Sequence, residues 1–230
     1  MLRIISISDT SNSNITFSYA DRERNLNILL LTFNLTDSAF LQELNEHILQ
    51  KVKGNRLYDV SESDLESVLQ ELFIEMNWQL YAKFHRTETY ECGVSLLLLV
   101  NLNKRCYLVQ FGRLLCGRLK GHKLEYIGKK WDNFKIKTKA DLFLLGSRDE
   151  DIFVKVITFE IPRKQMIIAI PSIYAEQLSS GINTGNIRRR IRRLYNKQPF
   201  SYFLLASEDF HYPKRSGFFY RVWRKICGKE

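Results

Sequence analysis

The hydrophobic pattern of this 230-residue chain predicts that it begins with β-structure. Residues 2–8 and 14–35 place their apolar positions at the spacing of two or three strands. Residues 27–33 read Asn-Ile-Leu-Leu-Leu-Thr-Phe. Such a nearly continuous apolar run is typical of a strand that is buried on both faces.

Two helical patterns follow the opening strands. Residues 36–54 start with Thr-Asp-Ser, which are good capping residues, carry apolar residues three and four positions apart, and end on Gly54. Residues 60–85 repeat this arrangement behind Ser61 and Ser63. We therefore expect a pair of neighbouring helices after the first strands.

After residue 92 the apolar spacing returns to that of strands. It predicts strands in residues 93–101, 105–111, 113–121, 123–128, 151–161 and 165–171, one helix in residues 173–196, and a closing strand in residues 201–208. This order of elements predicts an α+β domain in which two antiparallel sheets are covered by helices. The chain length fits one domain over residues 1–208 and a separate tail at 209–230.

Composition narrows the chemistry that this domain can perform. The four cysteines contain no CxxC pair and the four histidines are scattered, so we expect structural thiols and no zinc or other cofactor. The chain shows no leader pattern and no apolar run of about 18 residues, which favours a cytoplasmic location, with peripheral membrane association as an alternative. The net charge is +10, and the basic excess lies after residue 101.

Four ordered matches make the chain resemble the PPM-type metal-dependent protein phosphatases (type 2C). Residues 93–95 read Gly-Val-Ser where the family starts a strand with Gly-Thr-Thr, and Gly112 matches the glycine of its Val-Gly-Asp-Ser-Arg motif. Residues 139–178 and 198–208 are similar to the family's late strands. The resemblance implies a four-layer αββα sandwich, and an unrelated two-sheet sandwich is the alternative. Gly93 and Gly112 themselves predict close backbone packing at strand ends.

The family's catalytic centre holds two metal ions between aspartates from separate strand ends. Hard divalent ions need several carboxylate oxygens, so each matching position matters. This chain keeps an acid only at the first position, where Asp21 or Glu23 matches the early Asn-Glu-Asp. At the other positions, Asn34 and Leu35 match the Asp-Gly, Pro171 and Ser172 the Ser-Asp-Gly, and Phe200 or Ser201 the final aspartate. One carboxylate cannot hold a dinuclear centre. The pattern therefore predicts a degenerate member without catalytic residues or metal, a pseudophosphatase.

These replacements favour a catalytically inactive phosphatase-like domain that acts as a regulatory or scaffolding protein-binding module. Two alternatives stay open. The first is an active metal-dependent serine/threonine phosphatase with displaced ligands, for which Asp37 lies three residues from the expected position, although it is also a good helix cap. The second is a basic module that binds a polyanion or a membrane surface.

The helix predicted near the end of the domain is strongly basic. Its apolar stripe predicts docking on the domain, and its outward guanidinium groups predict binding to a phosphorylated or acidic surface or to an anionic membrane. A solvated basic face is the alternative. Base-specific recognition of nucleic acid is not indicated, because no nucleic-acid motif accompanies the charge. The residues concerned are Arg188, Arg189, Arg192 and Arg193.

The tail combines aromatic and basic residues behind Pro213 and Gly217. On a helix begun near Gly217, one apolar face would contain Phe219, Val222, Trp223 and Ile226. Such a face predicts a docking element for the chain's own domain, for an anionic membrane or for a partner's groove.

Overall fold

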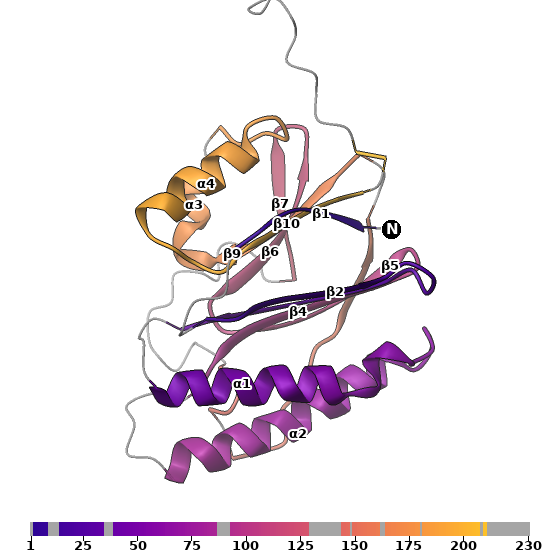
Figure 1. Ribbon diagram of the computed structural model, residues 1–230, viewed down its shortest axis with the longest axis vertical. Helices are drawn as coiled ribbons and strands as arrows, with labels where there is room; N and C mark the ends of the chain where they lie inside the picture. Colours follow the sequence, from indigo (N-terminus) through magenta and orange to yellow (C-terminus); the bar gives the residue numbers. More distant parts are fainter. Residues whose placement is uncertain are drawn as a thin grey trace, which may run out of the picture.

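The computed structural model describes residues 2–8, 14–34, 39–86, 93–128, 144–147, 149–161, 164–179, 181–207 and 209–210. These residues form two antiparallel five-stranded sheets that stack face to face, with helices on both outer sides (Figure 1). The predicted α+β class and the four-layer αββα order are therefore confirmed. Within the described residues, no helix combines the length and the apolar character needed to cross a membrane.

Sheet I has the strand order β1 (Leu2–Ile7), β10 (Phe203–Ser207), β9 (Met166–Pro171), β6 (Leu114–Lys120) and β7 (Lys123–Ile127). Sheet II has the order β2 (Thr16–Asp21), β3 (Leu26–Phe33), β4 (Ser95–Leu102), β5 (Arg105–Phe111) and β8 (Ile157–Glu160). Helices α1 (Ala39–Gly54) and α2 (Leu65–Arg86) cover sheet II, and helices α3 (Ala175–Ser179) and α4 (Ile187–Lys197) cover sheet I (Figure 1).

Three apolar layers hold the sheets and helices together. In β3, Ile28 and Leu30 pack in the cluster under α1 and α2, whereas Leu29 and Leu31 pack between the sheets. All eight residues of β3 are buried, so the predicted strand with two buried faces is confirmed. The residues of β9 alternate in the same way between the inter-sheet layer and the layer under α3 and α4.

The two early helices form where the spacing predicted them. Ion pairs join their exposed sides, because Lys51 Nζ lies 2.8 Å from Glu75 Oε1 and Lys83 Nζ lies 2.8 Å from Glu43 Oε1. Hydrogen bonds from the lysines lower the pKa of both carboxyl groups. Exposed pairs contribute little to stability, so the buried stripe fixes the helix pair. On α1 this stripe consists of Leu41, Leu44, Ile48 and Val52.

The single helix predicted for residues 173–196 is wrong. The chain instead forms a short 3₁₀ turn (Ser172–Tyr174), then α3, and then α4 after a loop. In that loop Gly181 has a φ of +63°, and Asn183 Oδ1 accepts hydrogen bonds of 2.9 Å from the backbone N–H groups of Gly185 and Asn186. Because this turn satisfies backbone donors outside a helix, the first helix stops and a second one starts.

The strand predicted for residues 151–161 is shorter than expected. Only β8 pairs with β5, and the residues before it run along α2. We call residues 149–156 the strap. Ile152 and Val154 of the strap are buried in the α1–α2 cluster, and Asn77 Nδ2 donates a hydrogen bond of 3.3 Å to the backbone oxygen of Glu150. Apolar residues do alternate along the strap, but their buried side chains pack against a helix and the strap does not pair with a neighbouring strand.

The two glycines at the strand ends permit close packing, as predicted. A Cβ atom on Gly93 would lie 2.5 Å from Leu144 Cβ. A Cβ atom on Gly112 would lie 2.4 Å from Ser95 Oγ, and Gly112 has a φ of +66°. Ser95 Oγ also accepts a hydrogen bond of 3.1 Å from the backbone N–H of Arg113. The turn that links β5 in one sheet to β6 in the other therefore has no room for a side chain.

Replacing Gly112 with alanine is expected to destabilise the protein by more than the cost of its positive φ. Gly121 is a matched control, because its φ is +59° and nothing lies within 4 Å of the position that a Cβ atom would take there. We expect Gly121→Ala to lower the free energy of unfolding by about 1 kcal/mol, and Gly112→Ala to lower it by about 2 kcal/mol more. Urea unfolding of both variants measures this, and equal losses would contradict the packing argument.

Two buried thiols lie in the layer between the sheets. Cys106 in β5 and Cys116 in β6 are both fully buried, which agrees with structural cysteines, while Cys92 and Cys227 lie outside the described residues. Burial raises the pKa of Cys106 from 9.0 to about 12 and raises the pKa of Cys116 as well. Both thiols therefore stay neutral in the folded protein when an unfolded chain would already ionise them.

This difference predicts alkaline destabilisation with a definite sign. A raised folded-state pKa contributes stability below the unfolded value of 9.0, and that contribution is lost as the pH rises towards 12. We expect the free energy of unfolding to fall across this range more steeply in the parental chain than in Cys106→Ala/Cys116→Ala, which is less stable at neutral pH but lacks both thiols. Parallel slopes in chemical denaturation at several pH values would refute the prediction.

Candidate functional site

Strand ends from both sheets meet at one end of the sandwich. In sheet II, Ser95 at the start of β4 pairs with Phe33 at the end of β3. In sheet I, Leu114 at the start of β6 pairs with Pro171 at the end of β9. We call the polar residues here the strand-end face, which consists of Ser8, Asn14, Thr16, Thr32, Asn34, Ser95, Arg113, Ser172 and Ser201. The structure thus brings the predicted positions Asn34, Pro171, Ser172, Phe200 and Ser201 to the same end of the molecule.

Hydroxyl groups join the two sheets at this face. Ser8 follows β1 in sheet I, and its Oγ lies 2.8 Å from Oγ1 of Thr16 at the start of β2 in sheet II. The same Ser8 oxygen accepts a hydrogen bond of 2.9 Å from the backbone N–H of Tyr202. One serine therefore links three strand ends.

Two side-chain oxygens at the β2–β3 edge also serve the backbone. The Oδ1 atom of Asn14 accepts a hydrogen bond of 2.7 Å from the N–H of Asn34, and Oγ1 of Thr32 accepts one of 2.7 Å from the N–H of Ile15. Asn14 and Thr32 are both buried. Sequence patterns did not single out Asn14, because an asparagine before a strand is also an ordinary turn residue.

The opposite side of the face is closed by the β5–β6 turn. Ser95 Oγ accepts a hydrogen bond from the N–H of Arg113. The backbone oxygen of Arg113 in turn accepts a hydrogen bond of 2.7 Å from the N–H of Ser172. Ser201 is 2% exposed, and its hydroxyl has no partner among the described residues. Ser172, at a predicted ligand position, is thus tied to the fold through its backbone.

The described residues of the strand-end face include no carboxylate, so they offer a divalent ion only neutral oxygens. Amide and hydroxyl oxygens bind such ions weakly when no anionic ligand accompanies them. Nowhere in the described ranges do three or more His, Cys, Asp or Glu residues gather into a group that could hold a metal ion. Leu35 and Asp37, which the sequence pattern also brought into question, lie outside these ranges.

Asp21 lies at the other end of the sandwich from the strand-end face. It ends β2 at the turn into β3, whereas Thr16, at the start of β2, is about 17 Å away along an extended strand. Its Oδ1 atom accepts hydrogen bonds from the N–H groups of Glu23, at 2.9 Å, and Arg24, at 3.2 Å. The structure therefore does not bring Asp21 together with the other predicted ligand positions, and its carboxylate stabilises a turn.

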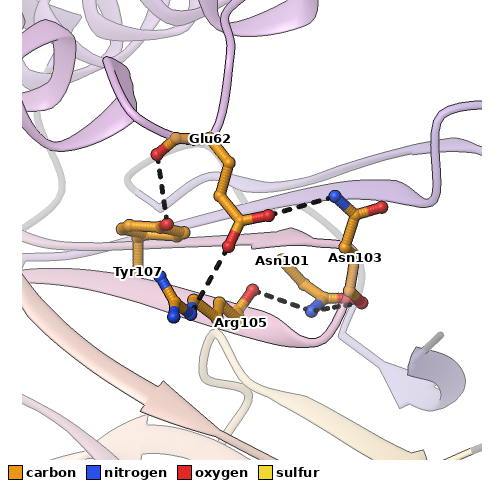
Figure 2. A network of polar contacts seen from close by, with 5 residues as sticks. All are labelled: Glu62, Asn101, Asn103, Arg105 and Tyr107. Atoms are coloured by element: carbon orange, nitrogen blue, oxygen red, sulfur yellow. Dashed lines mark hydrogen bonds and ion pairs between the residues drawn. The ribbon is translucent and has the colours of Figure 1, made fainter.

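A second polar cluster lies at this opposite end (Figure 2). The carboxylate of Glu62, in the loop before α2, accepts a hydrogen bond of 3.2 Å from Asn103 Nδ2 and lies 3.4 Å from Arg105 Nε. Tyr107 donates to the Glu62 backbone oxygen at 3.3 Å, and Asn101 Nδ2 donates to the Arg105 backbone oxygen at 3.0 Å. These contacts fasten the start of α2 to the β4–β5 turn, which is a structural role.

Helix α4 docks as its sequence predicted. Its own residues Ile187 and Ile191 are buried against the domain. Arg190 donates a hydrogen bond of 2.9 Å from Nη2 to the backbone oxygen of Gln177 in α3. The four predicted arginines, Arg188, Arg189, Arg192 and Arg193, are exposed. Whether they bind an anion stays a prediction, and the four tail residues Phe219, Val222, Trp223 and Ile226 lie outside the described residues.

The strap presents an exposed aromatic surface that the sequence pattern did not reveal. Phe153 is 85% exposed although its neighbours Ile152 and Val154 are buried. Trp78 of α2 is 41% exposed and donates from Nε1 to Asp151 Oδ1 at 3.0 Å, two residues before Phe153 in the strap. The strap and α2 therefore expose aromatic rings close in the chain to the acidic residues at the start of the strap.

The sequence and the fold of the chain were compared with those of known proteins. No protein-family model and no curated protein matches the sequence. Among solved structures, the S. agalactiae serine/threonine phosphatase matches with a TM-score of 0.67 at 7% identity, over 90% of this chain and 99% of that one. PppA from Pseudomonas aeruginosa matches with 0.61 at 14%, over 89% and 94%. The catalytic domain of the phosphatase PstP, solved with two manganese ions, matches with 0.59 at 16%, over 89% and 96%.

These likenesses establish the fold of the chain, which is that of the PPM-type serine/threonine phosphatases. The order of sheets and helices that the sequence resemblance implied is the order that the structure has. At such low identity the match carries no residue roles with it, so the chemistry depends on what the strand-end face itself offers.

We expect Phe153 to be dispensable for folding. Because its ring is almost fully exposed, Phe153→Ala should change the free energy of unfolding by less than about 0.5 kcal/mol. Val154→Ala is the matched control from the next position, and burial of Val154 predicts a loss of about 2 kcal/mol. Thermal and urea unfolding measure both, and a large loss in Phe153→Ala would show that the ring packs against the domain.

Proposed function

We propose that the chain is a catalytically inactive phosphatase-like domain that acts as a regulatory or scaffolding module by binding protein. One observation carries the proposal: among the described residues the side-chain oxygens of the strand-end face are neutral, and several of them form hydrogen bonds that close the fold. Asn14, Thr32 and Ser95 each accept a backbone N–H, and Ser8 links both sheets.

The physical reason is the cost of holding two divalent ions close together. Mutual repulsion and lost hydration must be offset by several anionic ligands in fixed positions. A set of amides and hydroxyls supplies none of that charge, and here the same oxygens would also have to give up hydrogen bonds that join strand ends. Without the two metal ions there is no metal-activated water, on which metal-dependent phosphoester hydrolysis depends.

A binding role is supported by the surface around the strap. The strap is held on α2 by Asn77 and Trp78 and by two buried side chains, so Phe153 is presented on a rigid support. Exposed aromatic rings on rigid elements are common anchors in protein interfaces. The carboxylates of Asp149 and Asp151 favour a partner segment with basic residues. Among proteins of this fold, PppA is described as a key regulatory component of T6SS.

The proposal predicts that the parental chain shows no saturable manganese binding and no metal-dependent phosphoester hydrolysis. Restoring acids at two strand ends, as Asn34→Asp/Ser172→Asp, should create a manganese site with a dissociation constant of about 1 mM or tighter. Isothermal titration calorimetry and a phosphopeptide assay measure both properties.

Ser18→Asp/Asn25→Asp is the matched control, because it adds the same charge at exposed positions away from the strand-end face. It should bind no manganese. Tight manganese binding and turnover by the parental chain would instead establish an active phosphatase with displaced ligands, and loss of both in Asp37→Asn would identify one ligand. Gain of binding in the control as well would show that net charge alone attracts the ion.

A further inference from the structure

The outer face of α4 is a concentrated positive surface. At about 100° per residue, Arg188, Arg189, Arg192 and Arg193 fall within an arc of about 140°, opposite the buried Ile187 and Ile191. All four guanidinium groups are exposed, and no ion pair to any of them occurs among the described residues. Helix α4 contains no acidic residue at all.

Surrounding elements extend the positive charge around α4. The N–H of Thr184, in the loop before α4, donates a hydrogen bond of 3.0 Å to the backbone oxygen of Gly121. This contact brings the β6–β7 turn, with the exposed Lys120, to the side of the helix, while Lys123 in the same turn is paired with Glu125 at 2.6 Å. Lys197 ends α4 and is also exposed.

Charge of the opposite sign lies on the other outer layer of the sandwich. Residues 39–86, which contain α1 and α2, carry eight acidic and five basic residues. The strap on the same layer adds Asp149, Glu150 and Asp151. Because α4 and the α1–α2 pair lie on opposite outer sides (Figure 1), a negatively charged plane would attract one side of the protein and repel the other.

We propose that the α4 face binds the surface of an anionic lipid bilayer and orients the domain with α1 and α2 away from it. The α4 face points away from sheet I, on the outside of the molecule. Its charges are spread along the helix and do not converge on a pocket. Such a geometry fits an extended charged plane better than a single phosphate group. The inference is independent of catalysis and goes beyond the proposed protein-binding role.

The point where the tail leaves the domain supports this partner. Phe210 packs in the apolar cluster under α3 and α4, and its backbone oxygen accepts a hydrogen bond of 3.0 Å from Arg3 Nη2. The last described residue before the tail therefore lies in the same layer as the arginine face. The sequence of the tail combines Phe219 and Trp223 with basic residues, the composition of segments that enter the interface of anionic membranes.

Sedimentation of the full-length chain with vesicles tests the proposal. We expect binding to phosphatidylcholine vesicles that contain about 30% phosphatidylserine, no binding to pure phosphatidylcholine, and weakening with added salt. Each arginine near such a surface is worth about fivefold in the partition constant, so Arg188→Gln/Arg189→Gln/Arg192→Gln/Arg193→Gln should reduce partitioning by on the order of several hundred-fold.

Two further variants separate the α4 face from general charge and from misfolding. Lysine at the same four positions keeps the charge and should retain most of the binding. Arg22→Gln/Arg56→Gln/Lys104→Gln/Lys155→Gln removes four exposed charges from the sheet II side and should bind within a few-fold of the parental chain.

Several results would overturn the proposal. One is vesicle binding that survives the four glutamines, and another is an equal loss in the sheet II control. A third is a parental chain that ignores phosphatidylserine vesicles but binds heparin or RNA, which would assign the face to a polyanion. Circular dichroism melts of every variant show whether a loss reflects the surface or the fold.

Discussion

Burial of apolar side chains on both faces of both sheets is the interaction on which the rest of this structure depends. Strands such as β3 and β9 alternate between two apolar layers, so neither sheet can face water. Helices must then cover each outer face, and the two sheets must cover each other. Polar chemistry is left with two places, the ends of the strands and the outer sides of the helices.

At the strand ends, the constraint is the satisfaction of backbone groups. Strands that stop together leave N–H and C=O groups without ladder partners, and these must be paired or hydrated. Asn14, Thr32 and Ser95 pair them with short neutral side chains, and Ser8 joins the sheets in the same way. A metal site on this fold would place charged oxygens at the same end. The same architecture can therefore carry a catalytic centre or a hydrogen-bonded closure, which is why fold alone does not decide activity.

On the outer helix layers, the constraint is charge. Helix α4 docks through two buried isoleucines and turns its guanidinium groups to solvent, while the α1–α2 layer and the strap carry the acids. The strap adds a different element to that layer, because Ile152 and Val154 anchor it and thereby force Phe153 outward. The molecule thus offers two unlike surfaces on opposite sides, one basic and one aromatic with acidic residues, and each suits a different class of partner.

The sequence by itself determined whether nearly every element is a helix or a strand, because the spacing of apolar residues follows which positions are buried. The order of these elements also determined the layers of the fold. It also indicated the neutral residues at Asn34, Ser172 and Ser201 and the arginine face of α4. The pattern failed at one local turn and at contacts between residues that are distant in the chain. The helix expected over residues 173–196 breaks because Asn183 bonds its own loop, and the strand expected over 151–161 lies partly on α2, because alternation records burial but not what covers it. Strand register decides which strand ends meet, and it cannot be read from the sequence alone. It places Asn14 in hydrogen-bond contact with Asn34 and places Asp21 at the opposite end of the sandwich.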